Sequence, residues 1–238
     1  MKSLLAFFIL LTPFFTTAQK LTGAQLLDKS IAYHDPGQNW EKFNDTLVVN
    51  MKIPNNPDRL STININLPSD MFYVKAINDG NITEYTVNQG NCEVVFNGTK
   101  NPDEATQREF GVNCERANVY KDYYTYLYGL PMKLKDPGAI VDPIVRYDNF
   151  DGKDYLILKV TYDPAVGSDV WFFYFDPDTY AMEIYQFYKG DPDGEGKDTG
   201  EFILLSEESV ISGIRFPKNR AWYYNKGAKY LGTDFLLN

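Results

Sequence analysis

His34 is the only histidine in the chain and the residue most suited by type to acid–base chemistry. It is followed directly by Asp35, and a histidine beside a carboxylate can act as a general base or serve a Ser-His-Asp triad. A single histidine excludes a multi-histidine metal site, and no Gly-x-Ser-x-Gly sequence is present to display a nucleophilic serine. His34 also falls in the last turn of a predicted helix, where the helix dipole stabilises a basic side chain. We therefore favour a structural role for His34 over a general-base role, and we assign no catalytic residue.

The acidic segment at 191–201 partly matches a calcium-binding loop. Positions one, three, five and six of such a loop correspond to Asp191, Asp193, Glu195 and Gly196. Position twelve is Phe202, and the nearest carboxylate, Glu201, comes one residue early. The flanking segments also resemble strands, whereas the calcium-binding motif is flanked by helices. We favour a solvated hairpin loop, leave calcium binding at this loop open, and predict no cofactor and no metal site.

Five tyrosines crowd one predicted helix, at Tyr120, Tyr123, Tyr124, Tyr126 and Tyr128. The helical period places Tyr120 and Tyr124 on the face expected to pack on a sheet, with Tyr123 and Tyr126 off that face. An exposed tyrosine suits contact with lipid or sugar, because its ring is apolar and carries one hydroxyl. An aromatic stripe on a helix is more often part of a core, so we favour packing over ligand contact.

The composition excludes two classes of protein and one class of partner. Of the 238 residues, 44% are hydrophobic and 16% aromatic, which is enough for a substantial core and excludes a disordered chain or a coiled coil. The 32 acidic and 23 basic residues give a net charge of −9. Such a chain lacks the positive surface that phosphate backbones require, so we expect no nucleic-acid partner.

Residues 1–18 follow the sequence pattern of a secretory signal peptide. Lys2 precedes an apolar run at 4–11, and small residues stand before Gln19. The apolar run is too short for a spanning helix, which needs about 20 residues, and no later stretch is apolar enough. Cleavage after Ala18 removes one basic residue and changes the net charge from −9 to −10. We therefore expect a periplasmic or extracellular protein with no transmembrane segment in the mature chain.

Cys92 and Cys114 are the only cysteines. In an exported chain, an even and minimal cysteine count predicts one disulfide, which would contribute roughly 3 kcal/mol in the chain-entropy model. The alternative is two buried thiols, since cysteine often serves as a small hydrophobic residue. The spacing lacks the Cys-x-x-Cys arrangement of redox catalysts.

Three helices are expected. Thr22 and Gln25 form a capping box for a helix over 22–34, which Asp35-Pro36-Gly37 ends. Asn101 is expected to cap a second helix that ends at Gly111, and a third runs from 115 or 116 to 128. The last two form a helical insert at about 101–128.

The rest of the chain alternates apolar and polar residues with period two, in segments separated by turn sequences such as Asn78-Asp79-Gly80. Because consecutive segments are joined by hairpin turns without crossover helices, we predict an α+β fold. It is a curved antiparallel β-meander, an open half-barrel of about 11–12 strands. The N-terminal helix and the helical insert lie on one face, and 19–238 forms a single domain.

The segment 170–175 is aromatic on both faces and must be covered on both sides. One interpretation places it centrally, with helices on one side and curled-over strands on the other. The other interpretation is that one side lines an apolar cavity. A register error of one residue would exchange Trp171 for Phe172 on the inner face.

Four stretches carry a family resemblance: 33–36, 123–138, 222–225 and 230–234. Through them the mature chain resembles an uncharacterised family of exported proteins of Bacteroidetes-type bacteria. More distantly, the order of helix, strands, helical insert and strands resembles the half-barrel of periplasmic lipoprotein carriers (LolA/LolB-like). That resemblance implies an open curved sheet with helices on its concave face that shelters acyl chains or a peptide.

We therefore expect an exported, non-enzymatic binding protein that shelters an apolar ligand such as a lipid or lipoprotein acyl chain. The predicted ligand-binding residues are Tyr124, Trp171, Phe173, Tyr185 and Trp222. The tyrosine-rich helix and the segment 131–138 would form a movable cover over them. The alternative is a structural or protein-interaction module of the cell envelope, with an envelope protein as partner. An enzyme that uses paired carboxylates ranks third.

Overall fold

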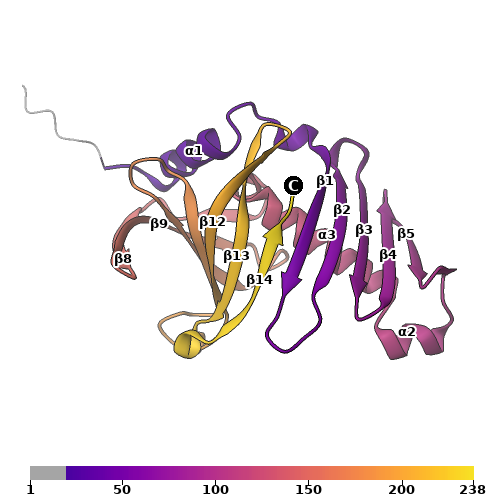
Figure 1. Cartoon of the computed structure of the whole chain (residues 1–238). Helices are drawn as coiled ribbons and strands as arrows, with labels where there is room; N and C mark the ends of the chain where they lie inside the picture. The colour runs from indigo at the N-terminus through magenta and orange to yellow at the C-terminus, as the bar shows by residue number, and fades with distance from the viewer. Residues whose placement is uncertain (1–19) are drawn as a thin grey trace, which may run out of the picture.

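The computed structural model describes residues 20–238, so the predicted signal peptide lies outside the described residues. Within that range, 14 strands form one antiparallel sheet, which curves around a long helix (Figure 1). The α+β class and the open curved sheet agree with the prediction. Two short edge strands that the alternation pattern missed, β6 and β7, help to raise the count above 11–12.

Six strands precede the helical insert: β1 (Asn44–Lys52), β2 (Arg59–Asn66), β3 (Met71–Asn78), β4 (Asn81–Asn88), β5 (Asn91–Phe96) and β6 (Thr99–Lys100). The strands after it are β7 (Ala139–Val141), β8 (Arg146–Phe150), β9 (Lys153–Tyr162), β10 (Asp169–Phe175), β11 (Met182–Lys189), β12 (Glu201–Ile211), β13 (Ile214–Tyr224) and β14 (Tyr230–Leu236). Short 3-10 helices occur at Trp40–Lys42, Leu67–Ser69, Met132–Lys135 and Lys226–Ala228.

The strand order differs from a simple meander. Neighbouring strands run β6-β5-β4-β3-β2-β1-β14-β13-β12-β11-β10-β9-β7, so the first and last strands meet in the middle of the sheet. Val49 of β1 is the register partner of Leu236 of β14, and Figure 1 shows the C-terminus beside β1. The helical insert therefore connects the two opposite edges of the sheet and has to cross one face to do so.

The helices form where local signals place them, with one correction. α1 (Gly23–His34) begins after the capping box of Thr22 and Gln25, as predicted. α2 (Glu104–Phe110) is capped by Asp103, whose side chain accepts a hydrogen bond from the Thr106 backbone N–H. The prediction that Asn101 caps this helix is wrong, because Asn101 has a left-handed φ of 47° and lies in the turn after β6. α3 (Cys114–Gly129) is capped by Asn113, whose side chain accepts a hydrogen bond from the Arg116 backbone N–H.

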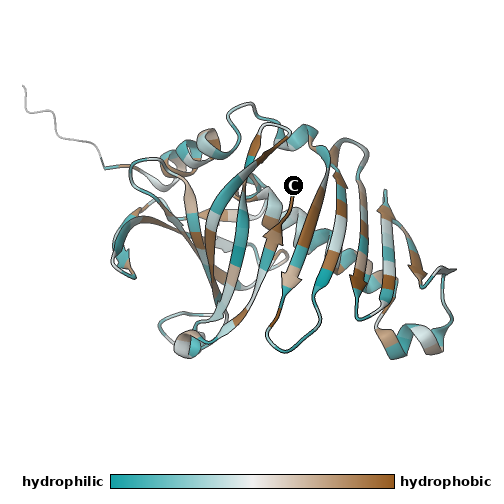
Figure 2. Ribbon diagram, viewed as in Figure 1, coloured by the Kyte–Doolittle hydropathy of each residue, from teal (hydrophilic) through white to brown (hydrophobic). Residues whose placement is uncertain are grey.

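The core lies between α3 and the inner face of the sheet. Strands alternate buried and more exposed residues, as β2 does, and Figure 2 shows the corresponding hydrophobic and hydrophilic bands. α3 contributes to two apolar clusters along its length: Tyr124 and Tyr128 pack with β1–β5, and Leu127 packs with β9–β12. At about 1.5 Å per residue, its 16 residues give a helix of roughly 24 Å, long enough to contact both halves of the sheet.

β10 is covered on both sides, as predicted, but it is not central, because only β9 and β7 lie between it and the edge of the sheet. Phe173 and Phe175 are fully buried on the inner face. On the outer face β8 curls back over the sheet, and the Phe150 ring lies 5.7 Å from the Tyr174 ring, centre to centre. The aromatic residues on both faces of this strand are therefore used in packing.

The Cys92 and Cys114 sulfurs are 2.14 Å apart, at disulfide distance. The bond joins β5 to the first residue of α3, which anchors the amino-terminal end of the covering helix to one half of the sheet. In the part of the chain that the structure describes, no helix has the length and apolarity needed to cross a membrane.

Candidate functional site

His34 is buried, and both nitrogens of its ring are engaged with backbone groups. Its ring is 2% exposed, its Nδ1 lies 3.0 Å from the Arg215 carbonyl oxygen, and its Nε2 accepts from the Met182 backbone N–H at 2.9 Å. These contacts fix a neutral ring in which Nδ1 donates. Burial lowers the pKa of His34, and the hydrogen bond to Arg215 opposes that effect. Both ring nitrogens are used to tie α1 to β11 and β13, as the structural interpretation predicted.

The adjacent Asp35 is also structural. Its two carboxylate oxygens accept from the backbone N–H groups of Asn39 and Trp40, each at 2.8 Å. These bonds order the turn that places Trp40 in the core. The His34-Asp35 pair is thus a folding element of the N-terminal region.

Four of the five predicted ligand-binding residues lie on the inner face of the sheet, and Tyr124 lies on the side of α3 that packs against this face. Tyr124, Phe173 and Tyr185 are buried in the core, whereas Trp171 and Trp222 are partly buried at its margin. Phe172 belongs to the cluster on the outer face. The register therefore turns Trp171 and Phe173 inward, and of the five residues only Trp222 lines an open apolar pocket.

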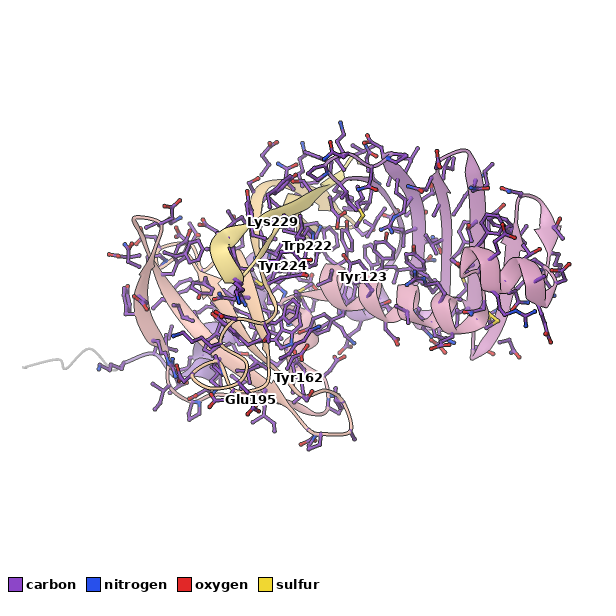
Figure 3. The ribbon with its side chains drawn as sticks, turned by 90° about the horizontal axis from the view of Figure 1, so that it is seen from below. Tyr123, Tyr162, Glu195, Trp222, Tyr224 and Lys229 are labelled. Atoms are coloured by element: carbon purple, nitrogen blue, oxygen red, sulfur yellow. A yellow bond between two sulfur atoms is a disulfide. The ribbon has the colours of Figure 1, made fainter. Side chains whose placement is uncertain are left out.

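That pocket opens at the rim of the sheet between β14 and α3. It has a volume of about 230 Å³, and its walls are mainly apolar: Met51, Ile53, Tyr123, Trp222 and Leu231. The rings of Tyr123 and Trp222 stack with their centres 6.2 Å apart, and Figure 3 shows both between the β13–β14 hairpin and α3. The helical period places Tyr123 off the packing face of its helix, which is the position of a residue that lines such an opening. We refer to this space as the Trp222 pocket.

Two carboxyl groups also border the Trp222 pocket, Glu201 and Asp234. Burial raises the pKa of both groups; Lys189 opposes that effect at Glu201, and Arg220 and Arg59 oppose it at Asp234. One Asp234 oxygen and the Trp222 indole nitrogen are buried without a protein hydrogen-bond partner. The pocket is thus an apolar space bordered by two carboxyl-bearing residues, an arrangement typical of small-molecule sites.

A second pocket of about 410 Å³ adjoins the first along the same rim. The two share Met51 and Ile53 as lining residues. The second pocket continues between the ends of β3–β5 and the first turns of α3, where it is bordered by Tyr85, Phe96, Phe110, Arg59, Arg116 and Tyr120. We refer to it as the arginine pocket.

Arg59 connects the sheet to α3 at this second pocket. Its guanidinium donates to the Tyr120 and Tyr124 hydroxyl oxygens, both at 3.2 Å. Burial alone would lower the pKa of Arg59, but Tyr124, Tyr120 and Asp234 outweigh burial and raise it, so the group stays charged. Alternation within β2 could have placed Arg59 on the inner face, but nothing in the sequence indicated its tyrosine partners.

The acidic loop forms a turn between β11 and β12, with the Gly196 N–H donating to the Asp191 carbonyl oxygen at 2.8 Å. Among residues 20–238, no group of three or more histidine, cysteine, aspartate or glutamate side chains is arranged to hold a metal ion.

The chain belongs to a family of unknown function, DUF6503, whose model matches residues 2–238. No curated protein sequence matches it. Its fold is similar to that of a LolA superfamily protein from Nitrosomonas europaea, with 10% identity over 92% of this chain and 93% of the other, and a TM-score of 0.54. A DUF1329 family protein from Desulfovibrio piger aligns with 9% identity over 90% of this chain and 91% of the other, with a TM-score of 0.46. The first similarity establishes the LolA-like fold predicted from the order of elements.

Proposed function

We propose that the protein is an exported, non-enzymatic binding protein that holds an acyl chain of a lipid or lipoprotein in the Trp222 pocket. The observation that carries this proposal is an apolar opening between β14 and α3, lined by Trp222 and Tyr123. The LolA-like architecture supports it, because this fold resembles the half-barrel of periplasmic lipoprotein carriers. The disulfide supports an oxidising compartment, periplasmic or extracellular.

The volume of the Trp222 pocket limits how much of an acyl chain it can hold. Small-molecule sites are typically about 300–1,000 Å³, and the Trp222 pocket measures about 230 Å³. It therefore accommodates part of a chain, and deeper insertion requires α3 to move away from Tyr185 and Trp171. The predicted cover is then α3 with the segment 131–138, whose Met132 and Leu134 are buried against the core.

Tryptophan fluorescence tests the proposal directly. In a Trp40→Phe/Trp171→Phe variant, Trp222 is the only tryptophan, and saturable quenching or a blue shift on titration with dodecanol or dodecanoate is the expected result. Leu231→Asp should weaken binding about tenfold or more, because a carboxylate in an apolar site is strongly unfavourable against an acyl chain. Ile144→Asp is the matched control, since Ile144 is 68% exposed and does not line the pocket. Equal effects of the two substitutions would contradict the proposal.

A cell-envelope interaction module is the second candidate. Tyr147 of β8 and Ile144, two residues before that strand, are each 68% exposed. β8 pairs only with β9 and leaves its other edge open. Exposed apolar residues beside an open edge strand are typical of protein contacts. If no apolar probe binds the Trp222-only variant, this candidate becomes the better account, and a Tyr147→Lys variant should then lose retention of envelope proteins.

A further inference from the structure

The arginine pocket differs in charge from the rest of the protein. The whole chain has a net charge of −9, yet the residues that line this pocket include two arginines and no aspartate or glutamate. The Trp222 pocket has the opposite character, with two carboxyl groups and no lysine or arginine in its lining. We refer to the two adjoining pockets together as the rim groove. It has an apolar, acidic end at the Trp222 pocket and a cationic end at the arginine pocket, and the two ends share Met51 and Ile53.

The two arginines converge on one ring. The guanidinium carbons of Arg59 and Arg116 lie 5.5 and 5.8 Å from the centre of the Tyr120 ring. Neither arginine has a carboxylate within 4.0 Å among the described residues, whereas Arg108 on the neighbouring α2 pairs with Glu104. Arg59 Nε is buried without a protein hydrogen-bond partner. Asp234 acts on Arg59 from beyond ion-pair distance. Two guanidinium groups that border one cavity and have no carboxylate in direct contact form a site for an anionic oxygen group.

The walls next to the arginines are apolar. Phe96 and Phe110 have their ring centres 4.7 Å apart, and Tyr85 and Tyr120 have theirs 5.5 Å apart. Asn78 and Asn81, also in the lining, add amide groups that can donate hydrogen bonds. A simple inorganic ion would use the donors but leave these aromatic surfaces in water. The combination fits a ligand that carries both an anionic group and an apolar chain.

The fold fixes the backbone position of Arg116 at the start of α3. Arg116 is the third residue of α3, and the disulfide at Cys114 fixes the start of that helix to β5. The amino-terminal end of α3 also contributes a positive partial charge to this side of the groove. The pocket is therefore built from the sheet, through Arg59, and from the anchored end of α3, through Arg116.

From these observations we infer that the arginine pocket binds the anionic carboxylate or phosphate group of an amphiphile whose acyl chain extends along Met51 and Ile53 into the Trp222 pocket. The inference deepens the proposed function and rests on it for the position of the chain. The anionic group cannot favourably occupy the other end of the groove, because Glu201 and Asp234 border the Trp222 pocket.

Calorimetric titration of dodecyl phosphate and dodecanol tests the inference, since the two probes have the same chain and differ in the anionic group. The protein should bind dodecyl phosphate roughly tenfold more tightly, the effect of one charged hydrogen-bonded contact. Arg116→Gln should remove most of that difference and leave the affinity for dodecanol unchanged. Arg116 is exposed and makes no side-chain hydrogen bond within residues 20–238, so this variant should fold. Arg108→Gln is the matched control and should keep the difference.

The possible negative results distinguish failure of the anionic site from failure of the proposed function. Equal affinities for the two probes, or equal effects of Arg116→Gln and Arg108→Gln, would overturn the anionic site while leaving the apolar pocket intact. Binding of neither probe would overturn the proposed function. Inorganic phosphate alone identifies the source of the anion: if it binds as tightly as dodecyl phosphate, the pocket is a free-anion site and the amphiphile is the wrong ligand.

Discussion

The guanidinium carbon of Arg220 lies 3.9 Å from the centre of the Tyr128 ring. Arg220 is 1% exposed, on β13, and Tyr128 comes from the last turn of α3. Asp234 of β14 is the register partner of Arg220 and is also buried. The carboxyl-terminal half of the covering helix thus rests on a buried charge of the sheet, which is compensated by an acidic neighbour.

Removing only the arginine of the Arg220–Asp234 pair should lower the stability of the protein. Arg220→Met leaves the Asp234 carboxylate buried without its main opposing charge, and we expect a loss of about 3–5 kcal/mol in the free energy of unfolding. Adding Asp234→Asn should recover part of the loss, because it removes the remaining buried charge. Urea denaturation of both variants measures the effect. Lys218→Met on the same strand is the control, and an equal loss there would contradict the assignment.

His34 should make stability dependent on pH. Burial lowers the pKa of folded His34 below its ordinary value of 6.5, so below pH 6.5 the unfolded chain binds more protons than the folded one. The contribution of His34 is fully present above pH 6.5 and is lost as the pH falls towards the lower folded pKa. We expect the stability advantage of the wild type over His34→Gln to shrink below pH 6.5 in urea titrations. An advantage that stays constant from pH 8 to 5 would refute this.

The disulfide should matter for stability. Cys92→Ser/Cys114→Ser removes the link between β5 and α3, and the expected loss is roughly 3 kcal/mol in the chain-entropy model. Thiol titration of the denatured, unreduced wild type should find no free thiol. Two free thiols would show that the bond does not form in the protein as isolated.

Gly129 should not tolerate a side chain. A Cβ atom there would lie 2.5 Å from a Trp40 ring carbon and 2.3 Å from Lys133 Cγ. Overpacking of this kind costs about 1–3 kcal/mol, which outweighs the helix propensity gained from alanine. Gly129→Ala should therefore lower the thermal midpoint, while Gly167→Ala, whose Cβ meets no atom within 4 Å, should not.

Local signals in the sequence determined the elements of this protein. The capping box of Thr22 and Gln25 predicted α1, and period-two alternation predicted the long strands, because caps and side-chain alternation depend on residues close together in the chain. At the second helix, the sequence favoured Asn101 as the cap, whereas Asp103 caps it in the structure.

Only the tertiary structure decided how these elements combine. The pairing of β1 with β14 joins residues nearly 190 positions apart, Val49 and Leu236 among them, and hairpin turns carry no information about that contact. The same pairing brings Met51 beside Asp234 and so creates the rim where the two pockets meet. The partners of Arg59 and His34 were likewise invisible in the sequence, because a side chain's burial and hydrogen bonds are set by which distant strands pack against it.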